Sequence, residues 1–425
     1  MKSFSRRNFL KTSSVATAVT AAGIKPAAAN HKINAAVIGC RNRGGKDAAY
    51  FLDSGQFNIV TVCDCDKAMF GNALDRIKDK VSRPPKQETD FRRVLEDRNV
   101  DAVIVATPDH WHALQTCMAL DAGKHVFLEK PASYNINDGK AMVAAQKKHP
   151  DRVVMIGTQQ RSGPHFFEAK EFIESGGLGK VGFCRGCIVH ERPVLPIVPD
   201  TKPPETLDYS MWTGPAPLRP YNEYRVHYNW HFVREYGTGE MGNWGAHWLD
   251  VIRWFMNVGF PTAASGAGGQ YVVKDAKEWP DTQTVIYEYP ELTVLWEMRL
   301  WSKFGVGGRT TRGCEFNGEK GSLTIDRGGW TFYPRDGEPE QHRGRGLDIP
   351  HVTNFADAIR GEAKTNASIE EGHTSATLCH LGNISADLGT RVQFDPKRQT
   401  IVGNPIAKKM MGRKYRSPWS IEEFI

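Results

Sequence analysis

The sequence has no long hydrophobic run beyond its N-terminal segment. A helix that crosses a bilayer needs about 18 or more consecutive apolar residues, and no stretch after residue 29 approaches that length. This absence excludes a helical membrane protein as the mature form. We therefore expect a soluble protein that does not insert into a membrane once an N-terminal signal is removed.

The chain also lacks an excess of charge of one sign. Five of its 55 lysine and arginine residues lie in the first 29 residues, which contain no acidic residue. The other 50 face 48 acidic residues, so the formal net charge falls from +7 to about +2 without that segment. Proteins that bind nucleic acid or anionic membranes carry a larger basic surplus, and we expect neither partner.

The N-terminal segment itself carries an export signal. Residues 5–11 read Ser-Arg-Arg-Asn-Phe-Leu-Lys, a twin-arginine motif, and the weakly apolar run over 12–24 is too short to span a bilayer. Residues 27–29, three alanines, supply the small residues of a cleavage site. We expect residues 1–29 to be a signal peptide. It would direct the folded chain through the twin-arginine machinery to the periplasm or another extracytoplasmic space.

Cysteines in a metal-binding or disulfide arrangement are missing as well. Cys63 and Cys65, like Cys184 and Cys187, cannot complete a four-ligand zinc site without two further ligands. A chain that folds in the reducing cytoplasm before export has little opportunity to form disulfides. We predict that the eight cysteines are buried free thiols and that the protein has no metal site.

From residue 32 the sequence alternates short apolar runs with amphipathic segments, which predicts strands separated by helices. The expected strands are 32–39, 58–64, 101–106, 125–128 and 152–156, and the expected helices are 44–53, 67–81, 91–98, 111–122 and 137–148. Continuous Val, Ile and Ala runs between helices are typical of a parallel sheet covered on both faces. Residues 30–155 are therefore predicted to form an α/β, doubly wound domain of the Rossmann type.

After residue 157 the apolar pattern changes to longer, alternating strands. The expected strands are 181–190, 284–289, 293–300 and 322–325, and the expected helices are 166–174 and 247–256. Alternation of apolar and polar residues is typical of antiparallel strands with one face toward solvent. We predict that residues 156–425 form an α+β domain with a mostly antiparallel open sheet. The helical segments 351–360 and 368–388 would pack back on the body.

The first strand leads into a glycine-rich turn. Residues 38–44 read Ile-Gly-Cys-Arg-Asn-Arg-Gly, so Gly39 and Gly44 occupy the first and third glycine positions of a dinucleotide-binding fingerprint, and Arg41 replaces the second. The helix that follows presents backbone N–H groups to a phosphate. Arg41 or Arg43 would add positive charge there, although a solvated loop arginine is an equally good reading of either residue.

Asp64 ends the second predicted strand, 25 residues after Gly39. A carboxylate at this place accepts hydrogen bonds from the ribose 2′ and 3′ hydroxyls and repels a 2′-phosphate. The position therefore favours NAD over NADP, with NADP as the alternative because of the nearby arginines.

Three further motifs lie at the ends of predicted elements. Residues 106–112 read Ala-Thr-Pro-Asp-His-Trp-His, residues 129–131 read Glu-Lys-Pro, and residues 237–250 contain a Gly-rich stretch that ends in Ala-His-Trp-Leu-Asp. With the first-strand motif and a late stretch over 371–384, they resemble the Gfo/Idh/MocA family of nicotinamide-dependent oxidoreductases, whose signature includes Glu-Lys-Pro. The resemblance covers essentially the whole mature chain.

The resemblance implies a cofactor site, a carbohydrate substrate and a homo-oligomer, either a dimer or a tetramer. The implied cofactor-binding residues are Gly39, Arg41, Arg43, Gly44, Asp64, Thr107, Pro108, Asp109, His112, Glu129 and Lys130.

Two residues are implied as catalytic. Lys130 follows a parallel strand at the edge where open α/β sheets bind ligands. Partial burial beside the cofactor would lower the pKa of Lys130 and let it bind or deprotonate a sugar hydroxyl. His247 opens a helix of the second domain and is suited to take a proton near neutral pH.

The surroundings of His247 depart from the family pattern. Many members have Asp four residues before this histidine, where this chain has Asn243. An amide can orient the imidazole but cannot stabilise an imidazolium by charge. Asp250 shares the helical face of His247 and is expected either to substitute in part or to serve the structure alone. Asn243 and Asp250 are therefore tentative substrate-side residues.

The remaining substrate candidates are aromatic and basic residues in loops. Trp230, His231, Arg161 and Tyr236 fall near pocket positions of the family, where rings stack on sugar C–H faces and Arg binds hydroxyls or carboxylates. Ordinary packing explains such residues equally well.

These features together predict a periplasmic oxidoreductase that transfers a hydride between a carbohydrate and NAD(P). No pool of free nicotinamide nucleotide is expected outside the cytoplasm, so the cofactor would stay tightly bound and return the hydride to a second substrate. One alternative is a redox-neutral glycosidase that works by oxidation and elimination. Another is a non-catalytic sugar- or nucleotide-binding module.

Overall fold

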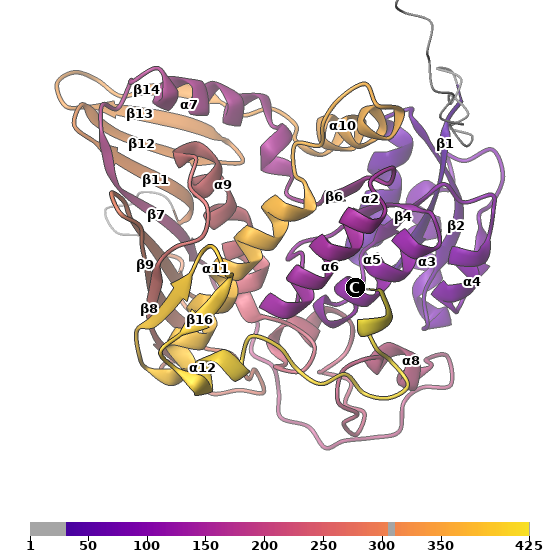
Figure 1. The fold of residues 1–425 in the computed structure, drawn as a ribbon. Helices are drawn as coiled ribbons and strands as arrows, with labels where there is room; N and C mark the ends of the chain where they lie inside the picture. The colour runs from indigo at the N-terminus through magenta and orange to yellow at the C-terminus, as the bar shows by residue number, and fades with distance from the viewer. Residues whose placement is uncertain (1–30, 305–310, 425) are drawn as a thin grey trace, which may run out of the picture. The chain divides into compact units, whose positions relative to one another are not determined.

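A six-stranded parallel sheet is built from the apolar runs of residues 33–156 (Figure 1). The computed structural model describes residues 31–304 and 311–424, so the predicted signal peptide, 1–29, lies outside the described residues. In spatial order the strands are β3 (Lys86–Glu88), β2 (Phe57–Cys63), β1 (Ile33–Ile38), β4 (Ala102–Val105), β5 (His125–Leu128) and β6 (Val154–Ile156). This is the Rossmann order, and it confirms the predicted fold of the N-terminal half. The short, polar β3 was not predicted.

Helices connect these strands as crossovers. They are α2 (Asn42–Asp53), α3 (Phe70–Ile77), α4 (Phe91–Glu96), α5 (Asp109–Asp121) and α6 (Ile136–Lys148). Apart from β3, the strands between them are mostly buried, and all four residues of β4 and of β5 are buried. Such continuous burial explains the unbroken apolar runs of the sequence.

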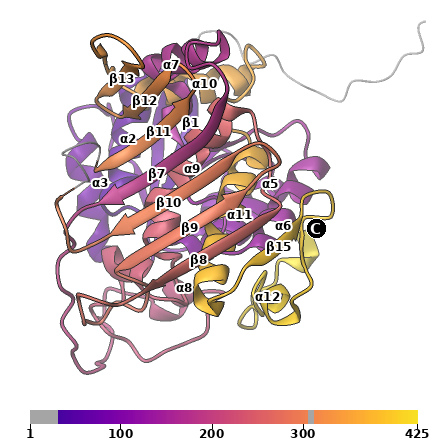
Figure 2. The same cartoon turned by 90° about the vertical axis from the view of Figure 1, so that its left-hand side faces the viewer.

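A second sheet of ten strands follows, and its outer face is seen in Figure 2. The strands in order are β14 (Glu340–Arg343), β13 (Gly329–Pro334), β12 (Gly321–Asp326), β11 (Arg312–Gly318), β7 (Val181–Val189), β10 (Thr293–Arg299), β9 (Thr282–Glu288), β8 (Ala263–Gly269), β15 (Val392–Asp395) and β16 (Thr400–Val402). The β7–β10 pair is parallel and the other neighbours are antiparallel. This confirms the mostly antiparallel sheet, although β8, β11 and β13 to β16 were not predicted.

Helices cover the inner face of this sheet. They are α7 (Pro164–Glu174), α9 (Ala246–Met256) and the longest helix, α11 (Ile369–Leu388), with the short α8 (Tyr209–Thr213) and α12 (Pro405–Lys409) in the connecting segments. Figure 1 shows α9 and α11 between the two sheets. Within the part of the chain that the structure describes, no helix is long and apolar enough to cross a membrane.

The C-terminal segment returns to the first sheet. Helix α10 (Asp348–Arg360) places Phe355 among Phe51, Phe57 and Phe127, with ring centroids 5.7 to 6.1 Å apart. Further on, the ring of Trp419 packs edge-on against Trp111. Residues after 350 therefore complete the hydrophobic core of the N-terminal half.

None of the eight cysteines, all of which lie in the described part of the chain, forms a disulfide, as predicted. Seven are buried and Cys65 is half-buried. Burial raises the pKa of the Cys40 and Cys184 thiols well above the ordinary value, so these side chains behave as small apolar residues.

Candidate active site

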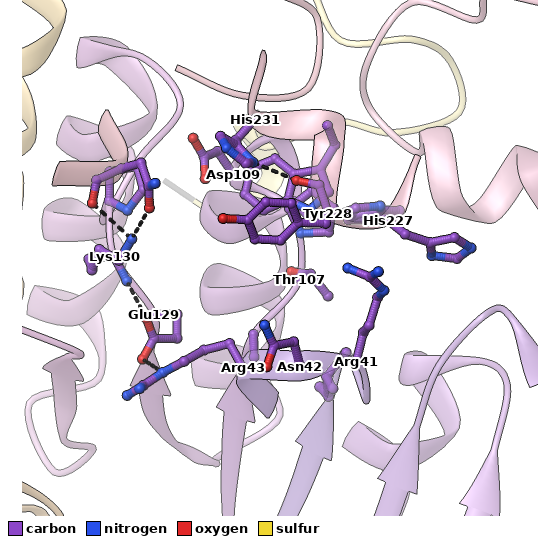
Figure 3. A pocket seen from close by; sticks show the side chains of 18 of the residues that line it. Arg41, Asn42, Arg43, Thr107, Asp109, Glu129, Lys130, His227, Tyr228 and His231 are labelled. Atoms are coloured by element: carbon purple, nitrogen blue, oxygen red, sulfur yellow. Dashed lines mark hydrogen bonds and ion pairs between the residues drawn. The ribbon is translucent and has the colours of Figure 1, made fainter. Parts of the chain in front are cut away.

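A cavity of about 380 Å³ lies along the carboxyl edge of the parallel sheet (Figure 3). Loops that follow β1, β2, β4 and β5 form one side, and segments around η3 (His227–Phe232) and the start of α9 form the other. The predicted residues that line it are Gly39, Arg41, Arg43, Asp64, Thr107, Pro108, Asp109, Glu129, Lys130, Trp230, His231, Asn243 and His247. Carboxyl edges of this kind are the ligand-binding edges of open α/β sheets.

The two glycines of the turn after β1 have no room for a side chain. Gly39 has φ +95°, and a Cβ there would lie 2.6 Å from the carbonyl oxygen of Ala106. A Cβ on Gly44 would come within 1.8 Å of the Gly39 oxygen. The two glycines let the chain turn tightly into α2, whose first residue, Asn42, lines the cavity. The N-terminus of α2 thus presents backbone N–H groups to an anionic ligand.

Asp64 is fixed by backbone groups at the end of β2. Its Oδ2 accepts the N–H of Cys40 at 2.8 Å, and its Oδ1 accepts the N–H of Asp66 at 3.0 Å. Burial raises the pKa of Asp64 to about 6, against the effect of these two backbone hydrogen bonds. The remaining lone pairs are free for hydroxyl donors. The glycine turn, the helix N-terminus and Asp64 therefore fit a dinucleotide with an unmodified ribose.

The side chain of Lys130, in the first domain, hydrogen-bonds to the second domain. Its Nζ donates to the backbone oxygen of Asn243 at 3.0 Å and to the side-chain Oδ1 of Asn243 at 2.8 Å. Burial lowers the pKa of Lys130, and the nearby Arg43 and Arg327 add to this effect, while Glu129 and Asp109 oppose it. One of the three ammonium donors is left for a ligand.

Behind Asn243 lies a carboxylate that sequence reasoning missed. The amide Nδ2 of Asn243 donates to Oε2 of Glu240 at 3.1 Å, and Glu240 also accepts Nε of Arg192 at 2.7 Å. Burial alone raises the pKa of Glu240, but contacts with His231 and Arg192 bring it down to about 2. Glu240 therefore stays ionised. Its place three residues before Asn243 in the same Gly-rich motif was the available signal.

A π-helical turn, Met241–Gly245, joins this cluster to α9. Such turns are rare and are frequent at functional sites. A Cβ at Gly242 would lie 1.7 Å from Oγ1 of Thr238, so a glycine is required for the turn to pack. The turn carries Asn243 and leads directly to His247 one helical turn later.

His247 is buried and meets an arginine from the far sheet. Nη2 of Arg327, in the turn between β12 and β13, lies 3.2 Å from Nε2 of His247. Because a guanidinium only donates, Nε2 accepts this hydrogen bond and the ring proton sits on Nδ1. Burial lowers the pKa of His247 well below its ordinary value, and Arg327 and Lys130 reinforce the shift. His247 is therefore neutral. Arg327 was not predicted, and no local pattern marks it.

Two family profiles match most of the mature chain. Residues 33–158 match the oxidoreductase family with an NAD-binding Rossmann fold, and residues 196–262 and 347–421 match the C-terminal alpha/beta domain of the same family. The chain belongs to the Gfo/Idh/MocA family. Residues 3–23 match the signal sequence of the twin-arginine translocation pathway.

Among curated relatives, inositol 2-dehydrogenase of Salmonella typhimurium is 30% identical over 150 residues, which are 35% of this chain and 42% of the relative. Levoglucosan dehydrogenase of Pseudarthrobacter phenanthrenivorans is 27% identical over 169 residues, which are 40% of this chain and 36% of the relative. The matched segments thus span less than half of either Gfo/Idh/MocA relative.

Solved structures extend the likeness in fold to both domains. The aldose-aldose oxidoreductase of Caulobacter crescentus, complexed with glycerol, is 18% identical with a TM-score of 0.67, covering 86% of this chain and all of the other. Levoglucosan dehydrogenase with NADH and levoglucosan is 19% identical with a TM-score of 0.66, covering 85% and 99%. At these identities the likeness concerns the Gfo/Idh/MocA fold.

Two implied cofactor residues make scaffold contacts, and only Arg43 of the two lines the cavity. Nε of Arg43 lies 2.8 Å from Glu129, and Nη2 lies 2.8 Å from Asp47 and 3.5 Å from Asp348. Its guanidinium is thus committed to carboxylates, although the residue borders the cavity. His112 does not line the cavity; its ring contacts the backbone oxygens of Pro131 at 2.8 Å and Thr107 at 2.9 Å.

Three tentative substrate residues lie outside the cavity. Arg161 binds Asp250 through two hydrogen bonds of 2.8 and 2.9 Å, and both side chains are buried. Asp250 also accepts the hydroxyl of Ser375, so it supports helix packing and not His247. Tyr236 is fully buried against the rings of His110 and Trp212. Asn243 lines the cavity but binds Lys130 and Glu240 instead of orienting His247.

Proposed function

We propose that this protein is a periplasmic oxidoreductase that transfers a hydride between a carbohydrate hydroxyl carbon and tightly bound NAD. One observation carries the proposal: Lys130 and His247, from different domains, line the same cavity as the glycine turn and Asp64. The twin-arginine signal supports action after export. The names of the relatives, which include inositol and levoglucosan dehydrogenases, support a sugar or polyol substrate.

The residues proposed to hold the cofactor are those at the strand ends. Gly39 and the N-terminus of α2 would bind the pyrophosphate, Asp64 the adenosine ribose, and Thr107 to Asp109 the adjoining part. NAD supplies the two-electron acceptor when it is bound. Export in the folded state into a space without free nucleotide supports retention of NAD as a prosthetic group. A retained cofactor also requires a second substrate, with a carbonyl group that accepts the hydride and so regenerates NAD.

The chain's own residues would move the proton. Lys130, as an ammonium held by Asn243, donates a hydrogen bond to the substrate hydroxyl oxygen and eases loss of its proton. His247, kept neutral by burial, accepts that proton on Nε2, the ring nitrogen that carries no proton in the assigned tautomer and that Arg327 contacts in the ligand-free protein. Glu240 stabilises the arrangement through the amide of Asn243.

The test uses freshly purified protein without added nucleotide. Denaturation should release close to one NAD per chain. The native protein, given a sugar and a sugar lactone together, should oxidise the sugar and reduce the lactone. Lys130→Met and His247→Gln should each reduce turnover by at least about a hundredfold. The matched controls Lys148→Met and His149→Gln, at surface positions, should not.

Protein that purifies without nucleotide would overturn tight binding, and full turnover by both active-site variants would overturn the proposed chemistry. Release of the aglycone from chromogenic glycosides in the same assay would replace net hydride transfer with the redox-neutral glycosidase reaction.

A further inference from the structure

Arg327 brings a positive charge into the cavity from the second sheet. It sits in the two-residue turn between β12 and β13, next to Asp326, and it lines the cavity together with Lys130 and His247. Its guanidinium carbon lies 5.4 Å from the ring centroid of Trp244. Apart from this ring, its hydrogen-bond partner is Nε2 of His247 at 3.2 Å.

The charge of Arg327 has no carboxylate partner within the described residues. Arg43 and Arg192, which line the same cavity, are both ion-paired: Arg43 with three carboxylates, and Arg192 with Glu240. Arg327 itself forms no ion pair with any residue of 31–304 and 311–424. The segment 305–310, Gly-Val-Gly-Gly-Arg-Thr, has no acidic residue to offer.

Arg41, which also has no ion pair among the residues that the structure describes, lies in another part of the cavity. It belongs to the glycine turn after β1, and Figure 3 shows it across the cavity from Lys130. Arg41 is therefore placed for the anionic groups of a dinucleotide. Arg327 contacts the proposed base, His247, and is therefore placed to bind the substrate and not the dinucleotide.

The contact between Arg327 and His247 has a chemical cost for the proposed function. A base needs a free lone pair, and the lone pair on Nε2 is occupied by the hydrogen bond from Arg327. A guanidinium presents two parallel N–H donors that match two oxygens of a carboxylate or a sulfate far better than a single imidazole nitrogen. An anionic ligand beside His247 would therefore compete for Arg327.

We propose that the substrate is a sugar with a monoanionic group, a carboxylate or a sulfate ester, that binds Arg327 and draws it away from His247. Nε2 of His247 is then free to accept the hydroxyl proton. The inference rests on the proposed function and narrows its substrate class to acidic sugars. Arg327 has two tasks in it: it selects the anion, and it keeps the base occupied until the anion arrives.

Binding measurements test this without turnover. The NAD-loaded protein is titrated with D-glucuronate, glucose 6-sulfate and D-glucose. The readouts are calorimetry and the change in tryptophan fluorescence that is lost in Trp244→Phe, since Arg327 contacts Trp244. A charge-assisted pair is worth about tenfold in affinity or more. At least one acidic sugar should bind about tenfold more tightly than glucose, and the two acids distinguish a carboxylate from a sulfate site.

The variant Arg327→Gln should remove this preference, so that the acidic sugars bind no more tightly than glucose. Arg327→Lys should keep part of it, and Arg335→Gln, an exposed arginine on the neighbouring turn, should keep all of it. The inference is overturned if neither acidic sugar binds more tightly than glucose, or if Arg327→Gln retains the preference. The NAD content and the dependence on Lys130 would then still stand, so the two proposals fail separately.

Discussion

Lys130 and Asn243 meet across 2.8 Å, and the oxygen that accepts the ammonium belongs to an amide and not to a carboxylate. The ionised carboxylate nearest along this chain of contacts, Glu240, is one hydrogen bond further away. A carboxylate in direct contact would favour the charged form of Lys130 strongly. The amide holds the side chain in place without doing so, which is consistent with the lowered pKa of Lys130.

Asn243→Asp should therefore raise the pKa of Lys130, because it places a negative charge against Nζ. If the ammonium form is the active one, the alkaline limb of kcat/KM against pH should move upward by about one unit. The measurement is the pH–rate profile, with Asn99→Asp at an exposed site as the control. An unmoved alkaline limb would show that Lys130 does not set it.

Arg41 and Arg43 are two residues apart and should behave differently. Arg41→Gln should speed release of bound NAD about tenfold, because it removes a charge facing the ligand, and leave the melting temperature unchanged. Arg43→Gln leaves the buried carboxylate of Asp47 and that of Glu129 without their cation. It should lower the free energy of unfolding by about 3 kcal/mol. Urea unfolding measures the loss of stability, and the rate of nucleotide release measures the loss of cofactor binding. Faster NAD release from Arg43→Gln, without a loss of stability, would mean that Arg43 binds the cofactor.

Retention of NAD should weaken below pH 6. Asp64 has a pKa of about 6 in the free protein because burial disfavours its charge. Ribose hydroxyls bind the charged form, so protonation competes with the cofactor as the pH falls through 6. The rate of NAD release should rise about tenfold between pH 7 and pH 5. Asp64→Asn should release NAD at a rate that does not vary over this range; a wild-type rate equally flat would contradict the prediction.

Stability should also fall in mild acid, through buried histidines. Burial lowers the pKa of His380 to about 3, whereas an unfolded chain has a value near 6.5. Since the folded pKa is the lower one, the unfolded state takes up the proton first, and the stability present above pH 6.5 is lost as the pH falls below it. The loss from His380 reaches about 2 kcal/mol at pH 5.

His380→Gln should therefore show a smaller difference in unfolding free energy between pH 7 and pH 5 than the wild type. His149→Gln, a half-buried surface position, is the matched control. Equal pH dependence in the wild type and in His380→Gln would show that His380 is accessible to protons in the folded state.

The parallel sheet was predictable because its strands are buried on both faces. Runs such as Ala102–Val105 are apolar throughout, and their burial is complete. The second sheet was harder. Strand β8 reads Ala-Ala-Ser-Gly-Ala-Gly-Gly and contains no β-branched or aromatic residue, so its strand conformation is imposed by its neighbours and by α11. Strand β14 has no buried residue and therefore leaves no pattern.

Some residues of the candidate site could likewise be predicted from the sequence, and others could not. Lys130 and His247 fall in motifs of contiguous residues, so their positions could be read along the chain. Arg327 reaches the cavity through the pairing of β12 with β13, and nothing in its local sequence indicates where that turn points. For Asp250 the sequence left two readings open, because residues three apart share a helix side. In the structure Asp250 is buried beside Ser375 and accepts its hydroxyl, as the structural reading expects.

The position of Phe355 in the core of the first sheet bears on the order of events during synthesis. Domains usually fold as units while the chain emerges, the N-terminal one first. Here the rings of Phe51, Phe57 and Phe127 pack against Phe355, which is synthesised some 230 to 300 residues later. The nucleotide-binding half thus closes only when translation is nearly finished. A signal that serves folded cargo is then exposed on the nascent chain well before there is folded cargo to export.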